Sequence, residues 1–222
     1  MTGVAERLKP GLFLRTGHRG AAGLAPENTM ASFQKAIDTG VDLIELDVQP
    51  TADGRIAVLH DPTVDRTTEA TGEISLMTYT DLLRLDAGYR FGPPHFPFRG
   101  HSLRIPLLEA VFDAFPRMSF VIEIKKSPRP NFLETLAGVI HARAPNRVIL
   151  ASDGSWCLNE LRRRLPEVPT NIIRQEVRWF YFMEKSGLSF LFRSRGAVFQ
   201  VPIYAGGEAR SGLRVVTRGF VR

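Results

Sequence analysis

The sequence predicts an α/β fold in which parallel strands curl into a (β/α) barrel. Apolar runs that suit strands alternate with amphipathic runs that suit helices along the 222 residues, and this alternation is typical of parallel strands joined by helical crossovers. Seven strands can be placed, a number that favours a closed barrel over an open sheet. Polar residues gather at the predicted strand ends, where barrels of this kind hold their catalytic groups.

Local signals set the boundaries of these elements. Asn28 and Asn131 are predicted N-caps, Gly40 is a predicted C-cap, and Pro106 is expected to open a helix. The predicted strands are 12–14 (running on to residues 17–20), 41–48, 56–59, 120–124, 148–151, 170–173 and 197–203. The predicted helices are 29–39, 79–85, 107–114, 131–142 and 156–165.

Length and composition point to a single domain over residues 1–222, with an irregular insertion at about 63–104 that is rich in Gly and Pro. Cys157 is the one cysteine, so an intrachain disulfide is excluded. No apolar run is long enough to span a membrane, and the polar segment Met1–Pro10 lacks a signal-peptide core. We therefore expect a cytoplasmic protein.

The chain carries a net charge of +6. A basic surface can attract phosphates, membranes or nucleic acid. The alternative is that the positive charge reflects codon bias toward arginine in a GC-rich genome. No run of five like charges occurs, so we expect no nucleic-acid partner.

Three carboxylates are the candidate metal ligands. Glu45 and Asp47 lie two residues apart on one predicted strand and so share a face, and Glu123 is predicted to reach the same mouth from another strand. Three inward carboxylates suit a hard divalent cation, Mg²⁺ or Ca²⁺. The alternative is an ionic network in which Arg19 and Lys125 neutralise two of the three.

Two histidines at predicted strand ends are the candidates for proton transfer. Histidine titrates nearest neutral pH, and His18 and His60 can divide the roles of base and acid. A single histidine at such a position more often has a structural role, but two histidines beside carboxylates favour a catalytic role. Arg19 can hold phosphate oxygens, although an arginine beside a strand end is often only a loop charge.

An ordered set of short motifs resembles the glycerophosphodiester phosphodiesterase family. Each motif alone is weak, but their order and spacing are specific over residues 17–126, with a looser match beyond. The motifs are His18-Arg19-Gly20, Pro26-Glu27-Asn28-Thr29, Glu45-Leu46-Asp47, Thr51-Ala52-Asp53-Gly54, His60-Asp61 and Glu123-Ile124-Lys125.

The resemblance implies a metal-dependent TIM (β/α)8-type barrel that splits small-molecule glycerophosphodiesters into glycerol 3-phosphate and an alcohol. It implies His18 and His60 as the catalytic acid–base pair, Arg19 and Lys125 as substrate contacts, and Mg²⁺ or Ca²⁺ as the cofactor. By the same resemblance, Glu45, Asp47 and Glu123 are the metal ligands. The family's last strand and helix should follow residue 221, so we expect a barrel that is incomplete at its C-terminal side.

An aromatic stretch bordered by arginines occupies residues 178–193. This composition is typical of a barrel helix with a large apolar face, and also of a segment that dips into a membrane surface. The membrane interpretation, which is the second of the two, fits a peripheral enzyme similar to lysophospholipase D. An inactive, truncated phosphate-binding barrel is a further alternative, which the retained histidines and carboxylates argue against.

Overall fold

The structure is a computed structural model that describes residues 3–8, 14–125 and 131–198. Its strands are β1 (Thr16–Gly17), β2 (Leu43–Pro50), β3 (Ile56–Val58), β4 (Ser119–Ile124) and β5 (Val148–Ala151). Its helices are α1 (Val4–Arg7), α2 (Met30–Asp38), α3 (Tyr79–Leu82), α4 (Leu108–Ala114), α5 (Phe132–Arg143), α6 (Ser155–Arg164) and α7 (Arg174–Lys185), with 3-10 turns η1 (Ile74–Leu76) and η2 (Ser189–Leu191).

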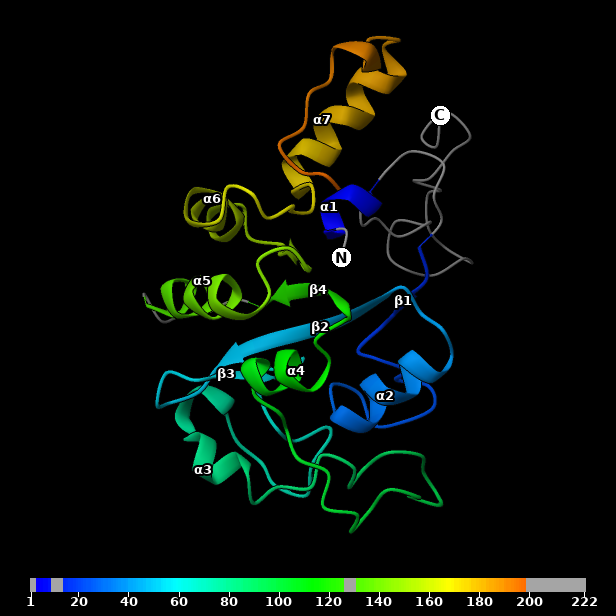
Figure 1. Cartoon of the computed structure of the whole chain (residues 1–222), viewed down its shortest axis with the longest axis vertical. Coiled ribbons are helices and arrows are strands. Elements are labelled where there is room, and N and C mark those ends of the chain that lie inside the picture. The colour runs from blue at the N-terminus through cyan, green and yellow to red at the C-terminus, as the bar shows by residue number, and fades with distance from the viewer. Residues whose placement is uncertain (1–2, 9–13, 126–130, 199–222) are drawn as a thin grey trace.

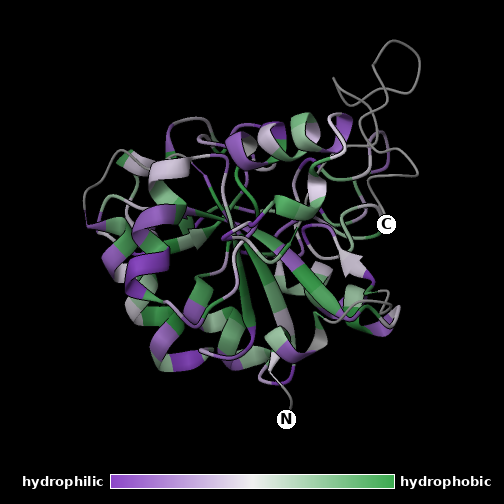
Figure 2. Cartoon of the chain, turned by 90° about the horizontal axis from the view of Figure 1, so that it is seen from above, coloured by the Kyte–Doolittle hydropathy of each residue, from purple (hydrophilic) through white to green (hydrophobic). Residues whose placement is uncertain are grey.

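The sheet is built from parallel strands in the order β1-β2-β4-β5. Isolated parallel bridges extend it from Leu150 to Thr170 and from Asn171 to Val198. Figure 2 shows largely hydrophobic strands near the centre, with helices of mixed polarity around them. The predicted parallel α/β class is therefore confirmed.

One strand does not run as the alternation pattern predicted. β3 pairs antiparallel with the second half of β2 and is not a parallel stave of the barrel. The turn at Asp53-Gly54 is too short for a crossover and reverses the chain directly, with Gly54 at φ +77°. As a result the chain returns along β2, and Leu59 N donates to Asp47 O at 3.0 Å.

Alternation along the strands gives the sheet two distinct faces. Ile44, Leu46 and Val48 of β2 belong to the larger core together with the helices, whereas Leu43 faces a smaller cluster with Val4 of α1. The same smaller cluster contains Val121 of β4 and Ile149 and Ala151 of β5. The inward face is thus apolar at its start and becomes acidic further along β2 and β4.

The segment 63–104 packs as its own layer against β3. Val64, Ile74 and Leu82 are buried in one cluster with Ala57 and Leu59, and Figure 1 shows α3 lying beyond β3, away from α5 and α6. The helix predicted at 79–85 is found, although it ends at Leu82.

Several boundary predictions are wrong at the level of single residues. Thr29, not Asn28, caps α2, because the Thr29 side chain accepts from Ser32 N at 3.2 Å. Pro106 lies two residues before α4 and is not its first residue. Asn131 does stand at the N-cap of α5, as predicted, although its side chain makes no capping bond.

The predicted outer strands form short pairings in the part of the chain that the structure describes. β1 covers Thr16–Gly17 and does not include Leu14, while residues 12–13 lie outside the described part. In the described parts of the segments 170–173 and 197–203, pairing is limited to the bridges at 170, 171 and 198, and residues 199–203 lie outside the described part. Among the described helices, none combines the length and apolar character needed to cross a membrane.

Candidate active site

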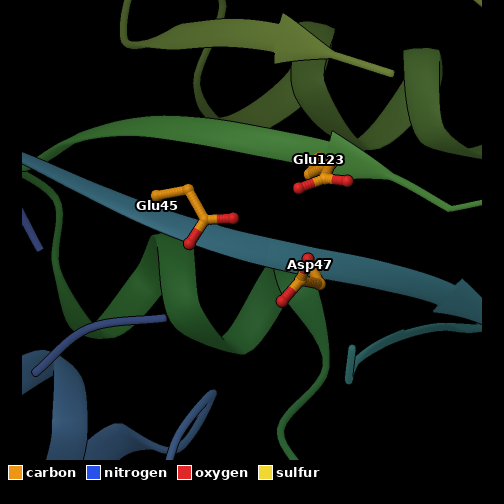
Figure 3. Close-up of side chains that lie close together, drawn as sticks. All are labelled: Glu45, Asp47 and Glu123. Carbon is orange, nitrogen blue, oxygen red and sulfur yellow. The ribbon is translucent and has the colours of Figure 1, made fainter. Parts of the chain in front are cut away.

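Three carboxylates from two neighbouring strands meet on the inward face of the sheet. The register of β2 and β4 places Asp47 beside Glu123, and Glu45 lies two residues earlier on the same face of β2. One oxygen from each carboxylate lies within 4.8 Å of the other two, and Figure 3 shows the cluster. Asp47 and Glu45 are buried, whereas Glu123 is partly exposed.

Two basic side chains and one side-chain amide already contact two of the three carboxylates. Lys125 Nζ lies 3.0 Å from Asp47 Oδ1 and also donates to Glu123. Arg19 Nε lies 3.4 Å from Asp47 Oδ2, which accepts from Asn28 Nδ2 at 2.9 Å. The ionic network that the sequence left open is therefore present around two of the three carboxylates.

Glu45 is the carboxylate that this network leaves uncompensated. Its Oε2 accepts from Arg19 N at 2.7 Å, but its Oε1 is buried without a hydrogen-bond partner among the described residues. Burial, followed by the charge of Asp47, raises the pKa of Glu45 to about 7. A buried carboxylate oxygen with no partner, next to two further carboxylates, fits a divalent cation bound by oxygen ligands.

A tight turn after β1 presents His18 and Arg19 to the carboxylates. Arg19 has φ +50° and Gly20 has φ +83°, and Gly20 N donates to Glu45 O at 3.2 Å. Ser32 of α2 fastens the turn, because its Oγ donates to Arg19 O at 2.9 Å and accepts from Ala21 N at 2.8 Å. The turn is thus tied to both β2 and α2.

His18 projects from this turn above Glu45. Its side chain is 70% exposed, and its Nε2 lies 3.9 Å from Glu45 Oε2. Burial of part of the ring, and then the charge of Arg19, lower the pKa of His18 below its usual value. A neutral imidazole beside the acidic cluster is able to accept a proton near pH 7.

His60 lies two residues after β3, where its backbone O accepts from Gln49 Nε2 of β2 at 3.0 Å. Its Nδ1 lies 2.5 Å from Asp61 Oδ1, and Arg66 Nε donates to Asp61 Oδ2 at 2.6 Å. Burial would raise the pKa of Asp61, but hydrogen bonds from Arg66 and His60 lower it below its usual value. An ionised carboxylate can only accept, so this hydrogen bond requires the proton on Nδ1 and leaves Nε2 without one in the neutral ring.

A continuous chain of ion pairs joins the two halves of the site. The guanidinium of Arg66 donates to both oxygens of Glu27 at 2.7 Å, and Glu27 Oε1 also accepts from Arg19 at 2.9 Å. The segment 63–104 is therefore connected to Asp47 through Glu27 and Arg19.

Sequence reasoning gave several site residues no role or a different one. Asn28 was expected to cap a helix, yet its side chain is buried against Asp47. The motif His60-Asp61 contains Asp61 but assigns it no role, and none of the motifs contains Arg66. The position of Asp61 next to His60 was the available signal, whereas the pairing of Arg66 with Glu27 joins residues 39 apart in sequence.

Comparison with known proteins gives this geometry a family context. The sequence profile described as the glycerophosphoryl diester phosphodiesterase family matches residues 18–181. A glycerophosphodiester phosphodiesterase from Caldanaerobacter subterraneus subsp. tengcongensis is 36% identical over 163 residues, which cover 71% of this chain and 65% of that protein. Lysophospholipase D GDPD1 from Mus musculus is 28% identical over 84% of this chain and 60% of that protein.

A solved structure shares the fold. A phosphodiesterase from Oleispira antarctica, in complex with the product sn-glycerol-3-phosphate, aligns with a TM-score of 0.65 and 26% identity, over 72% of this chain and 65% of that one. This chain thus spans somewhat less than two thirds of the length of these three proteins. From the profile match and the shared fold together, we conclude that the chain belongs to the glycerophosphoryl diester phosphodiesterase family.

Proposed function

We propose that this protein hydrolyses glycerophosphodiesters to glycerol 3-phosphate and an alcohol, with a divalent cation and a pair of histidines. The observation that carries the proposal is Glu45 Oε1, buried and unpartnered among the described residues, in a carboxylate cluster where His18 Nε2 lies 3.9 Å from Glu45 Oε2. Membership of the family and the product bound to the Oleispira antarctica phosphodiesterase support the reaction class.

The carboxylates Glu45, Asp47 and Glu123 would hold the cation. When bound, Mg²⁺ or Ca²⁺ supplies positive charge that offsets the charge developing on the phosphoryl oxygens. The donor set of three carboxylates suits both ions. Arg19 and Lys125 lie against the same carboxylates, and we assign their remaining N–H groups to the phosphate oxygens of the substrate.

The two imidazoles would move the protons of the hydrolysis. One imidazole accepts a proton from the attacking water while the water oxygen bonds to phosphorus. The other imidazole donates a proton to the oxygen of the leaving alcohol while the bond between that oxygen and phosphorus breaks. Asp61 fixes the ring of His60 through Nδ1, and the turn at Gly20 fixes the backbone beside His18.

Replacement of each histidine tests this proposal. With a divalent ion present, His18→Ala and His60→Ala should each lower kcat on glycerophosphocholine by at least about 100-fold, while calorimetric titration shows nearly unchanged metal affinity. The exposed His141 of α5 provides the control, because His141→Ala should leave both quantities unchanged. EDTA should stop the reaction, and added Mg²⁺ or Ca²⁺ should restore it.

Near-normal turnover of either catalytic variant would refute the acid–base assignment. Undiminished turnover in chelator would remove the cation from the mechanism. A chain that binds phosphate yet cleaves no diester in the presence of both ions would instead be a binding module.

A second candidate function is that of a lysophospholipase D at a membrane surface. The observation that favours it is the exposure of large apolar side chains on α7 and η2: Trp179 is 57% exposed, Phe182 60% and Phe190 78%. Trp179 and Phe182 stack with ring centroids 5.8 Å apart. Figure 1 places α7 at one end of the long axis, beyond the sheet, where such a surface is able to meet lipid.

A further inference from the structure

A cavity adjoins the candidate active site on the side of the segment 63–104. It has a volume of about 240 Å³ and lies between the loop that precedes α2 and two stretches of that segment, 66–67 and 87–92. Glu27 lines the cavity and also accepts from Arg19, whose Nε approaches Asp47. The cavity is therefore one side chain away from the residues assigned to the phosphate.

Two arginines line the cavity, and the partners of their side chains differ. Arg66 is saturated by carboxylates, because Nε donates to Asp61 and both terminal nitrogens donate to Glu27. Arg90 is exposed and is anchored through Nε, which donates to Thr68 O at 2.7 Å, while its Cζ lies 6.0 Å from the centroid of the Tyr89 ring. In the described part of the chain no carboxylate comes within 4.0 Å of Arg90, which therefore keeps its charge uncompensated.

The lining as a whole selects against a cationic occupant. Arg66 and Arg90 against Glu27 leave the charged side chains of the lining with one net positive charge. Phe91 is the one aromatic residue of the lining, so an aromatic cage for a quaternary ammonium group is not formed. The terminal N–H groups of an anchored arginine are instead suited to phosphate or carboxylate oxygens.

We propose that this cavity receives the alcohol part of the diester and that Arg90 selects alcohols that carry a second anionic group. This inference rests on the proposed function, because the reacting phosphate must bind beside Arg19 for its alcohol to reach the cavity. Arg90 acts as a specificity-determining residue and takes no part in the proton transfers.

A pair of substrates that differ only in the second anion tests the proposal. Glycerophosphoinositol and glycerophosphoinositol 4-phosphate are compared for kcat/KM with a divalent ion present, and for affinity by calorimetric titration of the metal-free chain, which requires no turnover. The 4-phosphate should be preferred at least about tenfold in both measurements. The Arg90→Gln variant should reduce that preference about tenfold, and Arg90→Lys should restore part of it because the charge is kept.

Arg84→Gln provides the matched control, since Arg84 is exposed on the same segment and outside the cavity. It should keep the full preference, and thermal melting should show that every compared variant is folded. A wild-type preference near one, or an equal loss in Arg84→Gln, overturns the proposal. Absence of all cleavage contradicts the proposed function, while the titration still decides separately whether the cavity prefers the anion.

Discussion

Asn28 shows how a single buried side chain positions a candidate metal ligand. Its Nδ2 donates to Asp47 Oδ2 at 2.9 Å, its Oδ1 accepts from Asp47 N at 3.3 Å, and its backbone adopts φ +56°. Asparagine tolerates this left-handed conformation better than most residues and also supplies both polar groups. The residue therefore fixes the carboxylate of Asp47 before any ligand binds.

Substitution at this position separates the two contributions. Asn28→Ala loses the hydrogen bonds and also strains the backbone, so it should lower the free energy of unfolding by about 2–4 kcal/mol. Asn28→Gly loses the same bonds without the strain and should be about 1 kcal/mol more stable than Asn28→Ala. Denaturant titration measures both, and equal stability of the two variants would contradict the role assigned to the backbone.

Glu45 couples cation binding to pH. Because its pKa is raised to about 7 by burial and by Asp47, the metal-free protein holds a proton there below pH 7 that a cation must displace. The contribution of protonated Glu45 to the stability of the metal-free protein is complete below about pH 4.5. This contribution is lost as the pH rises through about 7, because the pKa of Glu45 is higher in the folded than in the unfolded chain.

The expected result is a pH-dependent stabilisation by Mg²⁺ or Ca²⁺. The apparent affinity should rise by about tenfold per pH unit up to pH 7 and then level off, so the gain in melting temperature should be larger at pH 8 than at pH 5.5. Glu45→Gln should flatten this difference. A gain that is equal at the two pH values in the unaltered chain would show that Glu45 does not bind the ion in ionised form.

At the scale of elements, the turn between β1 and α2 depends on glycine at one position. A Cβ on Gly20 would lie 2.5 Å from Ser32 Oγ and 2.8 Å from Ser32 C, and the residue has φ +83°. Neither the backbone angle nor the space admits a side chain. The close approach of this turn to α2 is what brings His18 and Arg19 over β2.

Two alanine substitutions test the role of close packing in this turn. Gly20→Ala should lower the free energy of unfolding by more than about 2 kcal/mol and should weaken cation binding, because the Arg19 N–H no longer reaches Glu45. Gly54→Ala serves as the control: it has φ +77° but nothing within 4 Å of an added Cβ, so it should cost about 1 kcal/mol. Similar losses in the two variants would mean that only the angle matters.

At the scale of the whole molecule, the apolar surface of α7 and η2 predicts binding to lipid. Between residues 178 and 195 the sequence carries Arg178, Lys185, Arg193 and Arg195 against Glu184, so an anionic surface should bind better than a neutral one. Full burial of an aromatic side chain contributes about 1.5–3 kcal/mol. Phe180 is a poorer choice for substitution, because it packs edge-on against Phe192.

Co-sedimentation with phosphatidylglycerol vesicles measures this binding. The double variant Trp179→Ser with Phe190→Ser should lower the partition coefficient of the protein between vesicles and solution by at least about tenfold. Leu76→Ser is the control, since Leu76 is 75% exposed but lies in η1. Unchanged binding of the double variant would leave the membrane function without support.

The sequence by itself determined the parallel α/β class, the inward face of β2 and the family. A strand places residues two apart on one face, so Glu45 and Asp47 had to point together, and local motifs of two to four residues carried the resemblance. Helix and strand positions in the middle of the chain followed from the same short-range periodicity.

Only the tertiary structure decided which polar and charged side chains form hydrogen bonds and ion pairs with one another. The reversal of β3 places Leu59 N, next to His60, against Asp47 O, and the burial of Asn28 against Asp47 replaces its expected capping role. The tertiary structure also leaves Glu45 Oε1 buried without a hydrogen-bond partner in the described residues. Arg66 meets Glu27 from 39 residues away. Such pairings depend on distances between segments that are remote in sequence, and periodicity and motif spacing contain no information about those distances.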